Sequence, residues 1–428
     1  MAQVAVIGGG PAGLMAAEVV AASGCAVTVV DHMRSPGRKF LVAGRGGLNL
    51  THSEPLEQLL RRYTPTEPRL TAAIEAFPPA AVRAWCESLG QETFVGSSGR
   101  VFPRALRATP LLRAWLQRLD DLDVRFLTRH RFDGWDGEGR VRLTHLPGPS
   151  GSPELPNAAD EAAIPTATER VGTNEILGPV DAVVLALGGA SWPRTGSDGG
   201  WVDALRARGV AMSPLEPANS GFSVPWTAVF AERFAGFPLK NVAVTFGDRT
   251  VRGELMVTEN GLEGGPVYAL SHRLRDATRN ARTAVVTVDL RADLPEAKLV
   301  DRLSRPRGSQ STTSFLRKAG GLTPAAIGML REAHPGGLPT DPRQLAALVK
   351  AAPITVLGPS AIARAISTAG GVSWGEIDDD FMLRRIPGVF VCGEMLDWEA
   401  PTGGYLLQAT ISTAVAAAEG VLRQLASR

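Results

Sequence analysis

The sequence predicts an α/β protein in which a Rossmann-like domain is interrupted by an inserted, mostly antiparallel β plus helical domain. The first observation is a strand, a glycine turn, a helix and a second strand that follow one another over residues 3–31. The second is a pair of continuous apolar runs, 181–189 and 388–394, with the composition of central strands in a parallel sheet. Between these runs, short alternating segments are separated by turn signals. The predicted parts are a first domain segment, 1–195, the insert, 196–355, and a return segment, 356–428.

The N-terminal motif has the spacing Gly8-x-Gly10-x-x-Gly13 directly after an apolar strand. In such a motif the first glycine allows a tight turn, the second lets the backbone approach a pyrophosphate, and the third lets the helix pack closely on the sheet. The pyrophosphate would lie at the positive end of the helix. Asp31 closes the second strand, where a carboxylate can accept hydrogen bonds from a ribose. The motif therefore predicts a dinucleotide site, and the alternative is a chance glycine-rich turn.

Composition places the chain among ordinary soluble globular proteins. Its 428 residues suffice for two or three domains, and 44% apolar with 21% charged residues is a typical balance. The formal net charge of +2 indicates no particular class of partner. Cys25, Cys86 and Cys392 have neither the number nor the spacing of a disulfide framework or a zinc site. We therefore expect no metal and a reducing compartment.

Targeting signals are not apparent in the sequence. The first predicted strand begins at residue 3, which leaves no room for a secretory leader. The alanine-rich segment 409–421 is too short to span a membrane and contains polar residues. We expect a cytoplasmic protein that does not enter a membrane.

The stretch after Asp31, residues 32–54, is rich in glycine and arginine. A flexible loop is one interpretation. We favour a loop whose backbone approaches an anionic cofactor, because functional loops gather at the carboxyl ends of parallel strands. Residues 54–119 then have the three-and-four apolar spacing of helices. Within them, 99–103 lack periodicity and are predicted to form a loop on the cofactor or substrate side.

Two segments are strongly basic. Residues 100–131 contain eight arginines against three aspartates, and 302–318 contain a second cluster of arginine and lysine. A solvated helix surface explains such clusters most simply. Contact with RNA or another polyanion is the alternative.

Two strands, 124–135 and 139–145, are predicted around the Asp136-Gly137 turn signal. They are followed by 147–173, which is rich in Pro, Ser, Ala, Gly and Glu and has no apolar periodicity. This composition predicts a flexible loop.

Near the C-terminus, the sequence Pro401-Thr402-Gly403-Gly404-Tyr405 opens a long predicted helix. A helix N-terminus with two glycines offers bare backbone N–H groups and a partial positive charge. Those properties suit the electron-rich edge of a reduced flavin. The chain has one complete dinucleotide fingerprint, so we expect one dinucleotide to be held by a full Rossmann unit.

Six segments spread from end to end carry a family signature. They resemble the BaiN-like, or YhiN-like, family of FAD-dependent oxidoreductases in VAVIGGGPAGLMAA, GRKFLVAGRGGLNLTHSE, GRVFPRALRA, GELMVTENGLEGGPVYALS, TAGGVSWGEID and GVFVCGEMLDWEAPTGGYLLQA. The resemblance implies an FAD-binding domain of glutathione-reductase type with an inserted middle domain. The commonest family pattern has a cysteine in the glycine loop where this chain has GRGGLN. The chain therefore resembles a distinct subfamily.

The resemblance also implies a set of FAD-binding residues. His32 follows the ribose acid, and Gly188 ends the central strand beside the glycine turn. The remaining members are Gly8, Gly10, Pro11, Ala12 and Gly13 on the pyrophosphate; Asp31 on the adenosine ribose; Arg38, Lys39, Gly44, Gly46 and Asn49 along the cofactor; the Phe132 backbone near adenine; and Gly393, Glu394, Asp397, Gly403, Gly404 and Tyr405 around the ribityl chain and isoalloxazine.

The predicted function is an FAD-dependent oxidoreductase that takes hydride from NAD(P)H, a transient donor, and reduces an activated carbon–carbon double bond. No catalytic residue is assigned, because structural roles are favoured for His52, Tyr405 and Cys392. The substrate would be a small molecule or a nucleobase. One alternative is a flavin-dependent RNA base-modifying enzyme that uses the arginine clusters to hold phosphates. Another is a flavin-binding interaction or sensor protein without turnover.

Overall fold

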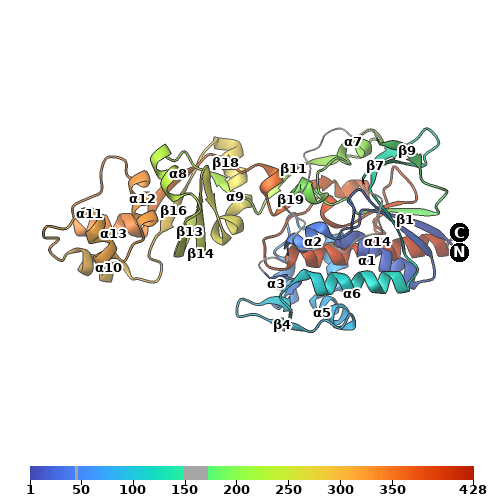
Figure 1. Ribbon diagram of the computed structural model, residues 1–428, viewed down its shortest axis with the longest axis horizontal. Coiled ribbons are helices and arrows are strands. Elements are labelled where there is room, and N and C mark those ends of the chain that lie inside the picture. Colours follow the sequence, from blue (N-terminus) through green and yellow to red (C-terminus); the bar gives the residue numbers. More distant parts are fainter. Residues whose placement is uncertain (44–46, 149–171) are drawn as a thin grey trace. The chain divides into compact units, whose positions relative to one another are not determined.

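The computed structural model describes residues 1–43, 47–148 and 172–428 (Figure 1). The chain forms two compact units, one of Met1–Glu216 with Ser367–Arg428 and one of Pro217–Ile366. The insert thus begins and ends later than the 196–355 boundaries expected from the sequence. The reason is that β11 (Met212–Ala218) pairs with β19 (Ser367–Val372) where the chain leaves and re-enters the first unit. Most of the predicted flexible loop, 149–171, lies outside the described residues.

The first unit is built on a five-stranded parallel sheet, which confirms the predicted Rossmann-type fold. Its order is β20-β10-β1-β2-β6, and the ends of β1, β2 and β10 are in register, with Ile7 opposite both Leu185 and Val30. All the glycine-bearing turns that follow these strands therefore lie at one edge of the sheet. The strands are β1 (Gln3–Ile7), β2 (Ala26–Asp31), β6 (Arg125–Thr128), β10 (Ala182–Leu185) and β20 (Val389–Val391).

Two helices, α1 (Pro11–Ala22) and α14 (Tyr405–Ala426), pack on each other and against this sheet (Figure 1). Small buried residues on both helices, such as Ala16 and Ala417, permit this close packing. The predicted helical segment 54–119 contains α3 (Leu56–Leu60), α4 (Pro68–Ala76), α5 (Pro79–Ser88) and α6 (Ala108–Asp121), and α2 (Arg38–Ala43) precedes it.

Helix α14 begins at Tyr405, where the glycine pair predicted a long helix to open, and it extends beyond the apolar segment 409–421 that is too short to span a membrane. Among the described residues it is the one helix with the length and composition to cross a membrane, and 67% of its most apolar window is buried inside the protein. Its buried polar side chains are hydrogen-bonded: Gln408 and Ser412 both donate to the Phe77 carbonyl. This is the pattern of a core helix.

Two sequence-based predictions in the first unit are wrong in detail. Residues 99–103, expected to form a loop, contain strand β5 (Arg100–Pro103), which pairs with β3 (Thr51–His52) and β4 (Thr93–Val95). Such short strands gain their stability from neighbours that periodicity does not reveal. The segment 124–135, expected as one strand, is split at Arg129, where φ is +62°. Its halves are β6 and β7 (His130–Trp135), and β7 joins a separate sheet with β8 (Val141–His145) and β9 (Thr173–Ile176).

The second unit has its own antiparallel sheet and its own core. The strand order is β17-β16-β13-β14-β15-β12-β18, and β13 and β14 form a hairpin across Gly247-Asp248. Leu255, Leu270 and Val288 are among its fully buried residues. The strands are β12 (Phe222–Ser223), β13 (Pro238–Phe246), β14 (Arg249–Thr258), β15 (Gly261–Glu263), β16 (Ala284–Asp289), β17 (Ala352–Val356) and β18 (Gly358–Pro359). The helices are α8 (Ala228–Phe234), α9 (Gly265–Ala281), α10 (Glu296–Leu303), α11 (Thr312–Phe315), α12 (Pro324–Ala333) and α13 (Pro342–Lys350).

Candidate active site

The glycine turn after β1 is held by backbone contacts that exclude side chains. Gly8 has a φ of +110°, and its N–H donates to the Val30 carbonyl at 2.7 Å. A Cβ on Gly8 would lie 2.3 Å from the Ala186 carbonyl oxygen, and one on Gly13 would lie 1.8 Å from the Gly8 oxygen. Both glycines are therefore required for the turn and for the packing of α1.

Gly10 differs from these two glycines. A Cβ at Gly10 would meet no described atom within 4 Å, and Gly10 is the N-cap of α1, where the described residues provide no capping side chain. Pro11 occupies the first turn without needing an N–H partner. The open space and the positive end of α1 fit a phosphate group of a dinucleotide. Ala12 lies on the sheet side, 2.7 Å from where a Cβ on Gly393 would stand.

Asp31 ties the glycine turn to the chain that follows β2. Its carboxylate accepts hydrogen bonds from the N–H groups of Gly9 and Met33, both at 2.7 Å. Burial raises the pKa of Asp31, while the charges of His32 and Arg38 act in the opposite direction. His32 itself lies beside the turn at Gly196, whose added Cβ would be 3.3 Å from the His32 Nε2. The carboxylate proposed for the ribose is therefore also a structural link within the site.

A partly buried ion pair joins the first and last segments of the unit. Lys39 Nζ, on α2, lies 2.6 Å from Glu394 Oε2, which directly follows β20 and Gly393. The same ammonium donates to Ser191 Oγ at 2.8 Å and to Ser197 Oγ at 3.2 Å, and Glu394 Oε1 accepts from the Thr368 N–H at 3.0 Å. Gly188 borders this group. Nothing in the sequence marks the two serines or the threonine as site residues, because only the tertiary fold brings them to Lys39 and Glu394.

The start of α14 rests on strand β3. Gly403 and Gly404 have φ values of +130° and +105°, and a Cβ on Gly404 would lie 2.3 Å from the Thr51 carbonyl oxygen. Thr51 Oγ1 also donates to Gln408 Oε1, one turn into the helix, at 2.6 Å. No described side chain caps the first turn of α14. Its N–H groups are thus left for a ligand or solvent.

Tyr405 turns its hydroxyl toward Glu54 and Arg62, and its ring stacks on His52 with centroids 5.2 Å apart. Burial and the neighbouring Glu54 raise the pKa of Tyr405. The Arg62 guanidinium binds the Glu54 carboxylate through two bonds of 3.1 and 2.6 Å. The phenol is therefore part of a structural network, and the favoured structural role for this side chain agrees with that geometry.

His52 also has a structural setting. Its Nδ1 accepts from the Glu54 N–H at 3.1 Å, and its Nε2 lies 3.1 Å from the Ser98 carbonyl, so the hydrogen bonds assign the proton to Nε2. Burial raises the pKa of both the Cys86 and the Cys392 thiols to about 12. Thiols with such pKa values are poor nucleophiles near neutral pH.

The remaining predicted residues lie in three places. Asn49 precedes β3 and has a buried Oδ1 with no hydrogen-bond partner among the described residues, which fits a donor on a bound cofactor. Asp397 accepts from Ser213 Oγ at 2.5 Å, and its carbonyl accepts from Trp374 Nε1. Phe132 is buried in β7 with its ring edge-on to Trp135. Gly44 and Gly46 lie outside the described residues.

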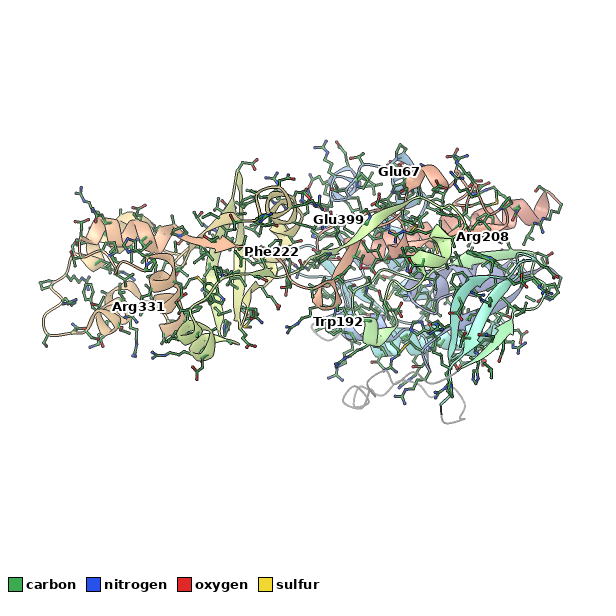
Figure 2. The ribbon with its side chains drawn as sticks, turned by 90° about the horizontal axis from the view of Figure 1, so that it is seen from above. Glu67, Trp192, Arg208, Phe222, Arg331 and Glu399 are labelled. Carbon is green, nitrogen blue, oxygen red and sulfur yellow. The ribbon has the colours of Figure 1, made fainter. Side chains whose placement is uncertain are left out.

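The loop after β10 carries an exposed aromatic residue next to the Lys39 partner Ser191. Trp192 (Figure 2) is 39% exposed and has a left-handed φ of +62°. A bulky residue rarely adopts that conformation, and it recurs at functional loops. Trp192 offers an apolar surface close to the Lys39 group.

Three arginines of the first basic cluster form ion pairs within the protein. Arg104 pairs with Glu92 at 2.6 Å, Arg118 with Glu18 at 2.9 Å and Arg131 with Asp133 at 2.8 Å. These pairs favour the simple interpretation, a solvated surface, over an RNA-binding face. Arg100 forms no ion pair within the described residues, and its Nε lies 3.5 Å from where a Cβ on Gly403 would stand. In the sequence, only its place in the GRVFP motif marked Arg100 as a candidate site residue.

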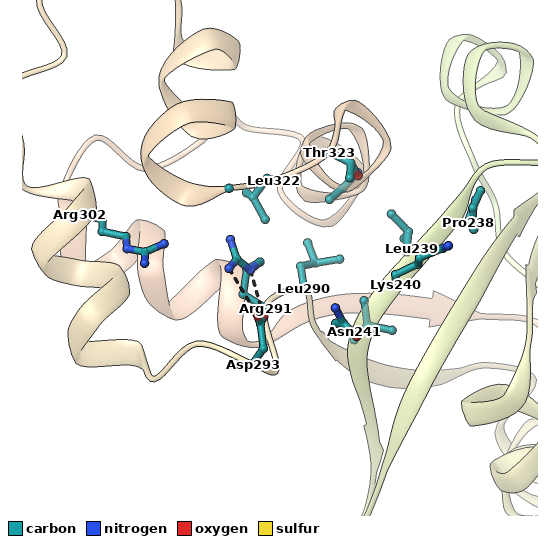
Figure 3. Close-up of a pocket in the computed structure, with 13 residues that line it drawn as sticks. Pro238, Leu239, Lys240, Asn241, Leu290, Arg291, Asp293, Arg302, Leu322 and Thr323 are labelled. Atoms are coloured by element: carbon teal, nitrogen blue, oxygen red, sulfur yellow. Dashed lines mark hydrogen bonds and ion pairs between the residues drawn. The ribbon is translucent and has the colours of Figure 1, made fainter. Parts of the chain in front are cut away.

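The second unit contains a cavity of about 640 Å³ (Figure 3). Arg291, Arg302 and Lys240 line it, and Arg291 is paired with Asp293 at 3.1 Å. None of the predicted FAD-binding residues belongs to it. In the described part of the chain, no group of three or more His, Cys, Asp and Glu side chains could hold a metal ion.

The parallel sheet, the open glycine turn and the second uncapped helix are those of a Rossmann-type FAD-binding domain. The chain matches the family model described as HI0933-like protein Rossmann domain over residues 2–148 and 162–420, and it belongs to that family. This confirms the family resemblance found in the sequence.

Individual relatives agree with this assignment. The chain is 25% identical to the 3-dehydro-bile acid delta(4,6)-reductase of Clostridium scindens, across 95% of this chain and 96% of that protein. Among solved structures it is similar to the 3-ketosteroid delta1-dehydrogenase from Sterolibacterium denitrificans, with a TM-score of 0.53 and 13% identity over 99% of this chain and 100% of that one. A flavocytochrome c3 fumarate reductase has a TM-score of 0.51 and 13% identity, over 99% and 78% of the two chains. These two structures show the fold.

Proposed function

We propose that this protein is an FAD-dependent reductase that transfers hydride from NAD(P)H to an activated carbon–carbon double bond of an apolar, steroid-like ketone. The observation that carries the proposal is the end-to-end similarity to an enzyme named as a 3-dehydro-bile acid delta(4,6)-reductase. The exposed Trp192 beside the Lys39 group is consistent with an apolar substrate.

Residues from both the N-terminal and the C-terminal segments of the first unit would hold FAD. The open Gly10 turn would receive the pyrophosphate at the N-terminus of α1. The Asn49 Oδ1 would accept a hydrogen bond from the cofactor. The chemistry that FAD supplies in such a site is hydride transfer. The uncapped N-terminus of α14 would stabilise negative charge on the bound cofactor, because it has free N–H groups and is the positive end of the helix dipole.

The test is an absorbance and reduction experiment on the full-length protein. An oxidised-flavin spectrum that bleaches anaerobically with NADH or NADPH would support the electron donor. Reoxidation by a 3-dehydro-bile acid with double bonds at positions 4 and 6, and not by its saturated analogue, would support the substrate class. If bound FAD is reduced but no conjugated steroid ketone reoxidises it, the substrate proposal is wrong.

A further inference from the structure

The feature that the proposed function leaves unused is Arg100. It lies in β5, directly opposite His52 of β3, so the two side chains share one face of this small sheet. His52 stacks on Tyr405 on that face. The Arg100 Nε lies 3.5 Å from where a Cβ on Gly403 would stand, so the guanidinium adjoins the turn that opens α14.

Arg100 and Arg62 lie near the same tyrosine, but a carboxylate compensates the charge of Arg62 alone. Arg62 Cζ is 5.9 Å from the centroid of the Tyr405 ring, and its charge is compensated by two bonds to Glu54. The Arg100 guanidinium has neither a carboxylate nor a hydrogen-bond partner within 1–43, 47–148 and 172–428. Because Arg100 is half-buried, leaving its charge uncompensated is unfavourable.

The surrounding structure fixes where this cation stands. Backbone bonds hold β5 between β3 and β4, and Thr51 of β3 is in backbone contact with Gly404. Gly96 N–H donates to the Arg100 carbonyl at 2.8 Å. The Cα of Arg100 therefore cannot move independently of the α14 turn, and its guanidinium is presented beside Gly403.

We propose that Arg100 forms an oxyanion subsite beside Gly403 and binds a negatively charged or strongly polarised oxygen of a bound molecule. A guanidinium is suited to this task because it stays charged and offers several donors in one plane. The oxygen can come from two sources, the flavin ring or the carbonyl of an enone substrate. Both gain negative charge when hydride arrives. The substrate source rests on the proposed function, whereas the flavin source requires only that FAD binds.

The experiment compares FAD-loaded wild type with Arg100→Gln and with Arg104→Gln. Arg104 is a matched control, since it lies four residues further on, is 71% exposed and pairs with Glu92. The first readout is the affinity for sulfite, which binds reversibly to oxidised flavins and bleaches them. If the flavin oxygen is the partner, Arg100→Gln weakens sulfite binding about tenfold or more, as expected for the loss of a charged hydrogen bond. Arg104→Gln leaves it unchanged.

The second readout is the KM for a 3-dehydro-bile acid with double bonds at positions 4 and 6. An unchanged sulfite affinity with a KM raised about tenfold in Arg100→Gln alone assigns the oxygen to the substrate. If both variants bind FAD and match wild type in sulfite affinity and KM, the subsite does not exist. Failure of wild type to use any steroid ketone would overturn the proposed function while leaving the sulfite comparison intact.

A second variant covers the case in which Arg100→Gln does not retain FAD. Arg100→Lys keeps the charge and much of the length but loses the planar fork. A sulfite affinity or KM between the wild-type value and a tenfold loss supports the subsite. Values equal to wild type in both measurements overturn a subsite that uses the planar guanidinium, because the ammonium keeps the charge and loses only the fork.

Discussion

The two glycine turns of the first unit, one before α1 and one before α14, are held in different ways. The hydrogen bonds of the α1 turn stay within one strand–helix–strand unit, since Gly8 bonds to Val30 and Gly9 to Asp31, although Ala186 also packs on Gly8. The α14 turn is closed by residues from another part of the chain, with Thr51 packed on Gly404 and Arg100 beside Gly403. A turn bonded within one such unit can be recognised in a sequence. A turn closed by separate segments becomes visible only in the fold.

The largest expected effect is on the turn before α1. Gly13→Ala places a Cβ 1.8 Å from the Gly8 carbonyl oxygen, which is backbone and cannot rotate away. We expect a loss of about 3 kcal/mol or more in the free energy of unfolding, measured by urea denaturation. Wild-type stability in this variant would contradict the packing described for α1.

Gly404→Ala tests the same requirement at the second turn. Its Cβ would lie 2.3 Å from the Thr51 oxygen, and alanine is disfavoured at a φ of +105°. We expect destabilisation of about 2–3 kcal/mol in the same measurement. A stable variant would show that β3 can move away from α14. The two turns would then differ in rigidity, with a rigid turn before α1 and a movable one before α14.

The Glu54–Arg62 pair gives a smaller, pH-dependent effect. Burial would raise the pKa of Glu54, but the bonds from Arg62 and Tyr405 outweigh it and lower that pKa. Folding therefore favours the charged form. The contribution is fully present above the unfolded-state pKa of about 4.3 and is lost as the pH falls through the folded-state value.

We expect Glu54→Gln to lower the free energy of unfolding by about 1 kcal/mol at pH 7, because Arg62 is partly exposed and solvent weakens the pair. In urea titrations the difference from wild type should stay constant down to about pH 4.3 and shrink only as the pH falls further, through the lowered folded-state pKa. A difference that is constant with pH would mean that Glu54 acts through packing and not through its charge.

The smallest effect on stability is expected at Gly10. Its φ is −80°, and no described atom lies within 4 Å of an added Cβ, so Gly10→Ala should leave stability unchanged or raise it by up to about 1 kcal/mol. If FAD approaches this turn, its affinity should fall about tenfold, because the methyl group separates the phosphate from the backbone. Equilibrium dialysis with FAD measures this, and an unchanged affinity would place the pyrophosphate elsewhere.

The sequence was sufficient for the central sheet, since Val4–Ile7 and the runs at 181–189 and 388–394 are apolar over their whole length. It was insufficient where structure depends on tertiary partners. Arg100–Pro103 is too short to show a period, and Arg129 divides one predicted strand between two sheets. Local propensity cannot report which sheet a strand will join.

The same limit applies to the site. Lys39 and Glu394 were each predicted from motifs, but their contact, and the three hydroxyl-bearing residues around them, depend on a fold that brings positions 39, 191, 197, 368 and 394 together. Tyr405 was singled out because it follows a glycine pair, whereas its partners Glu54 and Arg62 lie in a segment predicted as loop and helix, where nothing in the sequence marked them.

The Lys39–Glu394 pair has a consequence for synthesis on the ribosome. Strands β1 and β2 and Lys39 emerge early, but Glu394, β20 and α14 emerge only after the whole second unit has been made. Until then β10 has an unpaired edge and the face covered by α14 is open to water. A growing chain can therefore form half of the cofactor site, and capture of the cofactor by both halves becomes possible only when the return segment arrives.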